Sequence, residues 1–201
     1  MNLTAIFESW HIGDGNYPPL SVGQFVNLSF EFEPAHFHEI DPASGEMFES
    51  IGNGEYRFVA TSIKTYDKDR LAIMESNGFR FYIAGSPANS LLEGRRYSAE
   101  GTLLLDHYAW VESLGQRHNP PRLFYTFEVT QILKVNIPER FISRHDQGKS
   151  LPTRLAPADY SPSDVECVAT MEGQPFDEEF YIIDLDDSNV NGRDVPRTFI
   201  W

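Results

Sequence analysis

Apolar and polar residues alternate along several segments of this chain, and this period of two constrains the fold more than any other feature. After Gln24, the apolar residues Val26, Leu28, Phe30 and Phe32 occupy every second position. Successive side chains of a β-strand point to opposite faces, so the pattern predicts a strand with one buried face. Similar runs, rich in aromatic and β-branched residues, predict further strands. They cover residues 56–64, 71–83, 97–108 and 123–135.

Glycine and proline mark the ends of these segments. Asn77-Gly78 predicts a tight hairpin within residues 71–83. Pro34 is expected to end the first strand or to place it at an edge, and residues 41–54 are expected to form a loop. Residues 86–94 begin with Ser-Pro and end with Gly, which predicts one short helix. In the last strand the alternation slips at Ile132, where a bulge is expected.

Five or six strands with a single short helix predict an all-β fold with little α-structure, a small antiparallel barrel or sandwich. The expected order of three strands, a short helix and two strands resembles the layout of OB-type barrels. The chain has 201 residues, of which 41% are hydrophobic, enough for one domain with a core of its own. We assign residues 1–143 to the barrel or sandwich and residues 144–201 to a Pro-rich, acidic C-terminal arm.

The C-terminal arm holds apolar residues inside its acidic sequence. The arm is too apolar for a free tail, since burial of each large side chain contributes about 1.5–3 kcal/mol. The apolar residues are Phe176, Phe180, Tyr181, Ile182, Ile183 and Leu185. Residues 176–185 are therefore expected to pack against the barrel as an added strand. The Pro-rich stretch before them is expected to wrap the outside.

The net charge of the chain indicates which classes of molecule it can bind. The chain carries 16 Lys and Arg against 30 Asp and Glu, a net charge of −14. Such a surface repels the phosphate backbone of nucleic acids and favours basic partners. The densest acidic run lies in the arm and does not have the spacing of an EF-hand loop. We predict that these acids bind a basic protein partner, and the predicted binding residues are Asp177, Glu178, Glu179, Asp184, Asp186 and Asp187.

Two alternative sites remain open. Exposed aromatic residues on the middle strands could stack nucleic-acid bases, although phenylalanine is more often buried. The aromatic residues concerned are Tyr56, Phe58, Tyr66, Phe79, Phe81 and Tyr82, with Arg57, Arg80, Arg95 and Arg96 as sources of positive charge. His36 and His38 would share one face of a strand and could begin a metal site, with His107 or Glu112 as a third ligand. Without a defined third ligand, we predict that His36 and His38 do not bind metal.

No sequence motif indicates catalysis. Nucleophile-elbow, phosphate-loop and dinucleotide-binding patterns are absent from the sequence, and acidic neighbours disfavour the thiolate of Cys167. We therefore predict no catalytic residue, metal ligand or cofactor. A single cysteine, the lack of a signal-like N-terminus and the lack of an 18-residue apolar run predict a cytoplasmic protein outside the membrane.

The leading hypothesis is a non-enzymatic interaction domain that binds or neutralises a basic partner, for example an immunity-type inhibitor of a bacterial toxin. An OB-like domain for single-stranded nucleic acid or a small ligand is the second hypothesis. A metal-dependent enzyme that uses His36 and His38 is the third. The oligomeric state is left open.

Overall fold

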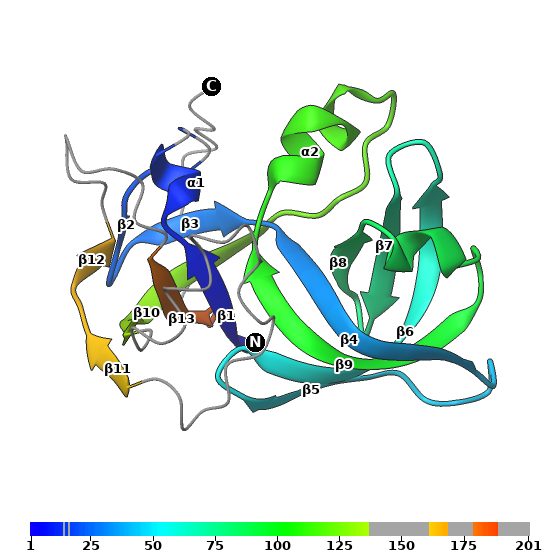
Figure 1. Ribbon diagram of the computed structural model, residues 1–201, viewed down its shortest axis with the longest axis horizontal. Coiled ribbons are helices and arrows are strands. Elements are labelled where there is room, and N and C mark those ends of the chain that lie inside the picture. Colours follow the sequence, from blue (N-terminus) through cyan, green and yellow to red (C-terminus); the bar gives the residue numbers. More distant parts are fainter. Residues whose placement is uncertain (14, 16, 137–160, 169–178, 189–201) are drawn as a thin grey trace, which may run out of the picture.

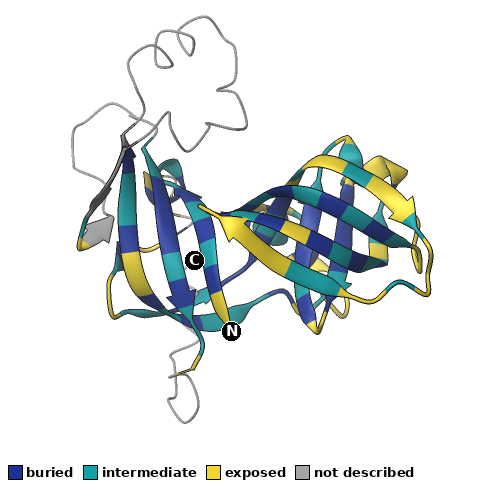
Figure 2. Cartoon of the chain, turned by 90° about the horizontal axis from the view of Figure 1, so that it is seen from below, coloured by how far each residue is buried: buried dark blue, intermediate teal, exposed yellow. Residues whose placement is uncertain are grey.

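Two long strands run through the middle of the molecule, where its two groups of strands meet (Figure 1). They are β4 (Phe30–Ile40) and β9 (Arg96–Leu105), which pair antiparallel along their length. The computed structural model describes residues 1–13, 15, 17–136, 161–168 and 179–188. Within these residues, a closed barrel lies on one side of the two strands and a second group of strands lies on the other (Figure 2).

The barrel contains β4, β9 and three strands between them, β6 (Glu55–Tyr66), β7 (Leu71–Ser76) and β8 (Phe79–Ala84). Strands β6, β7 and β8 form a meander, and β9 returns beside β6 in a Greek-key arrangement. Strand β4 closes the ring between β9 and β8. The predicted small all-β barrel is confirmed, with five strands. It is not wholly antiparallel, because β4 and β8 run parallel.

The second group of strands comes from distant parts of the sequence. In it, β13 (Phe180–Asp186) lies between β1 (Asn2–Glu8) and β10 (Tyr125–Asn136), antiparallel to both. Strand β10 also pairs with β3 (Phe25–Leu28) and with β11 (Ser161–Asp164). We call the strands β1, β3, β10 and β13 the second sheet. It joins the barrel where β1 meets β9 and where β3 leads into β4.

Several sequence predictions need correction. The strand predicted at residues 123–135 is β10, and it lies in the second sheet rather than in the barrel. The short helix predicted between residues 71–83 and 97–108 is present there as the 3-10 turn Pro87–Ser90, between β8 and β9. The predicted loop at residues 41–54 contains the strand β5 (Met47–Gly52), which pairs with β6. Its Cα partners in β6 supply a ladder that an isolated segment lacks, so tertiary context overrides the local glycine and proline content.

Pro34 does not end its strand. Strand β4 continues to Ile40 through a bulge between Pro34 and His36. The bulge leaves Ala35 out of the ladder, whereas Pro34 stays opposite Gly101 of β9. The Asn77-Gly78 hairpin is confirmed, since both residues have positive φ, at 50° and 79°. The predicted bulge in β10 is present between Val129 and Gln131, slightly before the position expected.

The remaining elements are short. Strands β2 and β12 pair with each other, the helices α1 and α2 flank the junction of the two halves, and one 3-10 turn follows α2 (Figure 1). These elements are β2 (Leu20–Ser21), β12 (Cys167–Val168), α1 (Trp10–Gly13), α2 (Tyr108–Glu112) and η2 (Leu114–Gln116). No helix among the described residues is long and apolar enough to cross a lipid bilayer.

One hydrophobic core extends through both halves. It contains residues from the barrel, such as Phe58 and Phe81, and residues from the second sheet, such as Phe7 and Ile183. Buried and less buried residues alternate along many strands (Figure 2). A smaller cluster lies between the outer face of the barrel and α2, and includes Tyr82.

Candidate functional site

The acids of the predicted C-terminal site that the structure describes form hydrogen bonds and ion pairs with residues of the same chain. Glu179 forms an ion pair with Lys134 and accepts a hydrogen bond from the hydroxyl of Tyr181. Burial alone would raise the pKa of Glu179, but these hydrogen bonds keep it below its ordinary value. Asp184 accepts a hydrogen bond from Thr4 Oγ1 at 2.6 Å. Both acids therefore help to hold β13 beside its neighbouring strands.

Of the other four acids in the predicted site, two have partners in the same chain and two lie outside the described residues. Asp186 accepts hydrogen bonds from the backbone N–H and hydroxyl of Ser188, which lower its pKa. Asp187 pairs with the amino group of Met1. Asp177 and Glu178 lie outside the described residues. The structure thus places four of the six predicted residues on or beside β13, each with a partner in the same chain.

The predicted aromatic surface is mostly interior. Tyr56, Phe58, Phe79, Phe81 and Tyr82 are all buried, as the frequency of buried phenylalanine led us to expect. Tyr66 remains half-buried, with the guanidinium of Arg117 located 4.5 Å from its ring centroid. A row of aromatic faces open to nucleic-acid bases is therefore not formed by these residues.

The histidine pair lies on the exposed side of β4. His36 is opposite Glu100 of β9, and His38 is opposite Ser98. His107 is elsewhere, buried at the end of β9 with its ring stacked on Tyr17 at 4.0 Å. Within the described part of the chain, no three His, Cys, Asp or Glu side chains come together in a way that could hold a metal ion.

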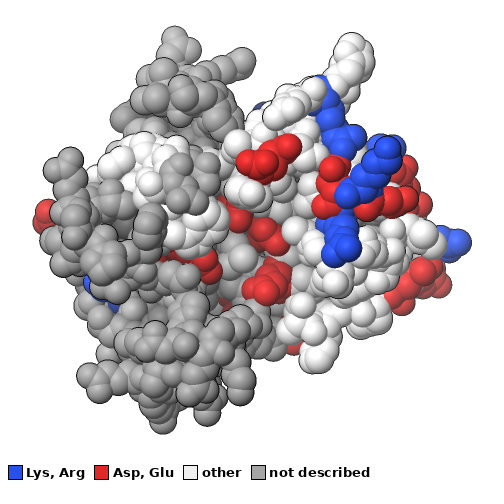
Figure 3. All heavy atoms as spheres, turned by 45° about the horizontal axis from the view of Figure 1, so that its top comes forward, with Lys and Arg blue, Asp and Glu red and all other residues white. Residues whose placement is uncertain are grey.

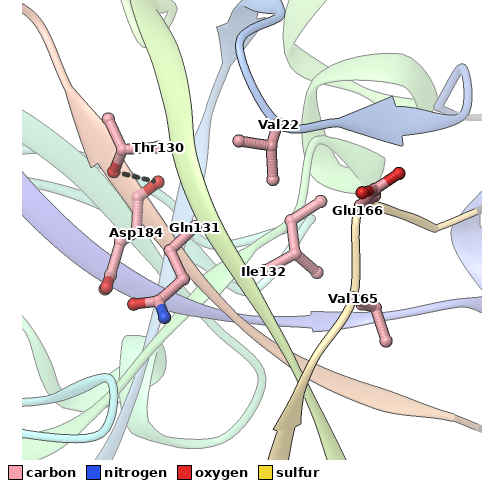
Figure 4. A pocket seen from close by; sticks show the side chains of 7 residues that line it. All are labelled: Val22, Thr130, Gln131, Ile132, Val165, Glu166 and Asp184. Atoms are coloured by element: carbon pink, nitrogen blue, oxygen red, sulfur yellow. Dashed lines mark hydrogen bonds between the residues drawn. The ribbon is translucent and has the colours of Figure 1, made fainter.

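A pocket of about 720 Å³ lies against the outer face of the second sheet (Figure 4). Thr130, Gln131 and Ile132 of β10 form its floor, and Thr130 donates a hydrogen bond to the backbone oxygen of Asp184. Val165 and Glu166 form one wall. These two residues belong to a short described segment, 161–168, with undescribed residues before and after it.

Acidic side chains from three elements meet at the junction of the two halves. We call Glu8, Glu31, Glu33 and Asp106 the junction cluster. Glu31 and Glu33 occupy alternate positions of β4, Glu8 ends β1, and Asp106 follows the last residue of β9. The intervening Phe30 and Phe32 fill the core, so the alternation of the strand directs both glutamates to the opposite face.

A buried tyrosine lies beside two of these acids. Tyr82 pairs in register with Glu31, because β4 and β8 run parallel there. Its side chain is only 1% exposed. The hydroxyl lies within hydrogen-bond reach of the carboxyls of both Glu31 and Asp106, and its hydrogen bonds act to lower the pKa of each.

The environment of the cluster favours protonated acids. Burial, followed by the charges of Asp106, Glu33 and Glu8, raises the pKa of Glu31 to about 8. Burial raises the pKa of Asp106 to about 6, although hydrogen bonds from Tyr108 and Tyr82 act in the opposite direction. Burial and the charge of Glu8 also raise the pKa of Glu33. Strongly shifted carboxyls that share a site are typical of functional sites.

A histidine completes the inner side of the site. His11 is buried beneath Trp10, whose ring stacks on it at 3.8 Å. Its Nε2 atom lies 3.7 Å from an oxygen of Asp106. Burial and the nearby His107 lower the pKa of His11 to about 4. At neutral pH His11 is therefore uncharged, and it does not neutralise Asp106.

Basic side chains are paired elsewhere. Ten of the sixteen Lys and Arg residues lie in the described part of the chain, and seven of these form ion pairs with Asp or Glu. None of the seven pairs involves an acid of the junction cluster. The seven are Arg57, Lys64, Arg80, Arg95, Arg96, Arg117 and Lys134. Figure 3 shows acidic side chains in the depression between the two halves, whereas most visible basic side chains lie on the barrel side.

Comparison with protein-family models, with curated proteins and with solved structures finds no match for this chain. Sequence reasoning missed the junction cluster because its acids are separated by up to 98 positions, from Glu8 to Asp106. The sequence does contain one indication of the cluster, because two glutamates, at positions 31 and 33, alternate with phenylalanines in a predicted strand.

Proposed function

We propose that this chain is a non-enzymatic interaction domain and that its junction face binds a basic partner protein. The observation that carries the proposal is the junction cluster, in which the carboxyls of Glu31, Glu33 and Asp106 are close to one another and burial raises the pKa of each. Placing like charges together in a buried site costs free energy. A cation supplied by a partner would offset that cost.

The overall charge supports the same function. With a net charge of −14, the chain attracts basic proteins over a distance of about one Debye length, about 8–10 Å, which accelerates association. Ion pairs on the barrel neutralise most of its described basic residues. The remaining acidic side chains can therefore attract a basic partner. An immunity-type inhibitor of a basic toxin belongs to this class. We place the function in the cytoplasm, because Cys167 is the only cysteine.

The test is affinity capture with the immobilised full chain from cells of its source, followed by mass spectrometry. We compare the unchanged chain with Glu33→Lys, an exposed acid of the cluster, and with Glu49→Lys, an exposed acid on β5. Both variants change the charge by the same amount. We expect a basic protein that elutes with salt, is retained by Glu49→Lys and is lost from Glu33→Lys.

Two results would contradict the proposal. Equal capture of the partner by both variants would show that binding does not use the junction face. Capture of an acidic protein or of nucleic acid would show that the charge of the chain does not select its partner.

A further inference from the structure

We propose that the free edge of β5 binds an extended segment of a partner protein as an added β-strand, with an arginine or lysine of that segment opposite Glu49. This inference goes beyond the proposed function. Strands β6 and β9 lie between β5 and β4, which carries Glu31 and Glu33, so the edge of β5 and the junction face are separate sites.

Strand β5 has a free edge. It lies below β9 in the view of Figure 1 and ends the strand order of its sheet, with β6 as its only hydrogen-bonded neighbour in the described part of the chain. Residues 49–52 are all exposed. Alternate residues of an edge strand direct their backbone N–H and C=O groups away from the one neighbour. These groups are therefore open to the ladder of another chain.

The barrel holds this edge in position. Phe48 packs against the core, and its ring centroid lies 4.7 Å from that of Tyr56 and 5.0 Å from that of Phe79. The backbone oxygen of Met47 accepts a hydrogen bond from Ser76 Oγ at 2.9 Å. A strand that is already extended and fixed loses little conformational freedom when another strand pairs with it, which favours strand addition.

The charges across the sheet indicate what the added strand carries. Because Phe48 points inward, Glu49 points outward, where it lies opposite Arg57 of β6. Arg57 lies in turn opposite Glu100 of β9 and is ion-paired with it at 2.6 Å. Glu49 has no ion pair among the described residues. A basic residue opposite Glu49 would continue the alternation of charge, and opposite charges on neighbouring strands stabilise their pairing.

Apolar side chains flank Glu49 along the strand. Met47, two residues before it on the same face, is half-buried. Ile51, two residues after it, is 45% exposed. Apolar residues placed two positions before and after the basic residue of the added strand would cover both side chains. The edge therefore fits a segment in which apolar, basic and apolar residues occupy alternate positions.

A second copy of the chain fits this edge less well. Two β5 strands paired antiparallel about their centres would bring both Glu49 carboxylates to neighbouring positions, and like charges on paired strands are destabilising. Both copies would also carry a net charge of −14. We therefore infer that the added strand comes from a basic segment of another protein.

The experiment uses the full chain and two peptides. One is acetyl-Ser-Val-Thr-Arg-Thr-Val-Ser-amide, and the other has glutamate in place of the arginine. Titration followed by amide chemical shifts measures both affinities, and hydrogen exchange of the β5 amides reports strand addition. We expect the arginine peptide to slow exchange in β5 and to bind about fivefold or more tightly than the glutamate peptide.

Matched variants locate the site. Glu49→Lys should reverse the preference, so that the glutamate peptide binds more tightly than the arginine peptide. Asp67→Lys changes the net charge by the same amount at an exposed position in the turn between β6 and β7. It should leave the ratio of the two affinities within about twofold of its original value. Equal affinities of the unchanged chain for the two peptides, or the same ratio in Glu49→Lys, would overturn the proposal.

Backbone methylation distinguishes strand addition from simple charge attraction. Two further arginine peptides carry N-methyl groups either on the arginine and both valines or on both threonines. The two sets of N–H groups lie on opposite edges of an extended peptide, and only one edge faces β5. We expect one methylated peptide to lose binding and the other to bind within about threefold of the parent. Undiminished binding of both would show that no ladder forms.

The two proposals can fail separately. Glu33→Lys should leave the ratio of the peptide affinities unchanged, because Glu33 belongs to the junction face. If the arginine peptide binds at β5 but no basic protein is lost from Glu33→Lys in the capture experiment, the proposed function is wrong and the β5 site stands. If that protein is captured through the junction face but the peptide does not bind, the β5 site is wrong and the proposed function stands.

Discussion

The barrel and the second sheet have similar strands but are assembled from the sequence in different ways. The barrel strands β6, β7, β8 and β9 follow one another within residues 55–105, and three of them form a continuous meander. The second sheet combines residues 2–8, 25–28, 125–136 and 180–186. The first arrangement depends mainly on local pairing, and the second requires the two ends of the described chain to meet.

This difference explains where the candidate site lies. The junction cluster takes Glu31 and Glu33 from the barrel strand β4, Asp106 from the residue after β9, and Glu8 from β1 of the second sheet. It can exist only when both halves are folded and joined. A site at such a junction is sensitive to the relative position of the halves, because its acids come from different elements. We therefore expect that a change in the second sheet destabilises the barrel and the junction cluster as well as the sheet itself.

The largest effect is expected on removal of β13. Truncation after Gln174 deletes Tyr181, Ile182, Ile183 and Leu185, all buried between β1 and β10. Each contributes about 1.5–3 kcal/mol of burial, and the sum is comparable with the whole stability of a typical domain, about 5–15 kcal/mol. We expect the truncated chain to lose its cooperative thermal transition in circular dichroism, because one core extends through both halves.

Hydrogen exchange separates the two halves in this experiment. Amide protection that persists in β6, β7 and β8 of the truncated chain would show that the barrel folds alone and that the continuous core does not couple the halves. Loss of protection in both halves is the expected outcome.

The second effect concerns the contact between the two shared strands. Gly101 of β9 pairs with Pro34 at the bulge of β4, and a Cβ atom at Gly101 would lie only 2.8 Å from Pro34 Cα. Backbone must move to accept it, so Gly101→Ala should lower the free energy of unfolding by about 3 kcal/mol. Gly45→Ala is the control, since a Cβ there meets nothing within 4 Å and φ is not positive. Urea denaturation measures the free energy of unfolding of both variants. Equal stability of the two would mean that the backbone at the bulge moves to accept the added Cβ atom without cost.

The barrel was more predictable from the sequence than the second sheet, for a physical reason. The alternation at residues 56–64 and the Asn77-Gly78 turn specify strands and a hairpin by local rules, and both are present. Strand β5 lies among glycines and prolines, and its pairing with β6 depends on tertiary contact. The role of β10 could not be read locally, since any half-buried strand has the same period whichever sheet it joins.

The site was less predictable still. The sequence shows the acids of β13 as a dense run, and the structure shows that they are hydrogen-bonded or ion-paired within the sheet. Glu31 shows in the sequence only as one polar residue of an alternating strand. Its unusual environment depends on Tyr82 and Asp106, which come near it through the parallel pairing of β4 with β8 and through the end of β9.

The third effect depends on pH. The pKa of Glu31 is raised to about 8 in the folded chain, so the folded state binds this proton more tightly than the unfolded state does. The stability that this group contributes is fully present below about pH 4.5 and is lost as the pH rises through about 8. Glu31→Gln should therefore raise the free energy of unfolding by roughly 4 kcal/mol at pH 8 and change it little at pH 4.5.

Comparison with Glu49→Gln removes the effect of net charge from that measurement. Glu49 is exposed on β5, so its removal should alter stability by less than about 0.5 kcal/mol at either pH. If Glu31→Gln were destabilising at pH 8, Glu31 would be an ionised and well-solvated residue, and the junction cluster would not be a strained site.

The smallest effect is expected for the ion pairs that neutralise the barrel surface. Arg57 and Glu100 form such a pair at 2.6 Å across β6 and β9, and their side chains are 49% and 42% exposed. Water and salt screen a pair this exposed, so a double-mutant cycle with Arg57→Met and Glu100→Gln should give a coupling free energy below about 0.5 kcal/mol. A coupling above about 1 kcal/mol would mean that this pair stabilises the barrel itself.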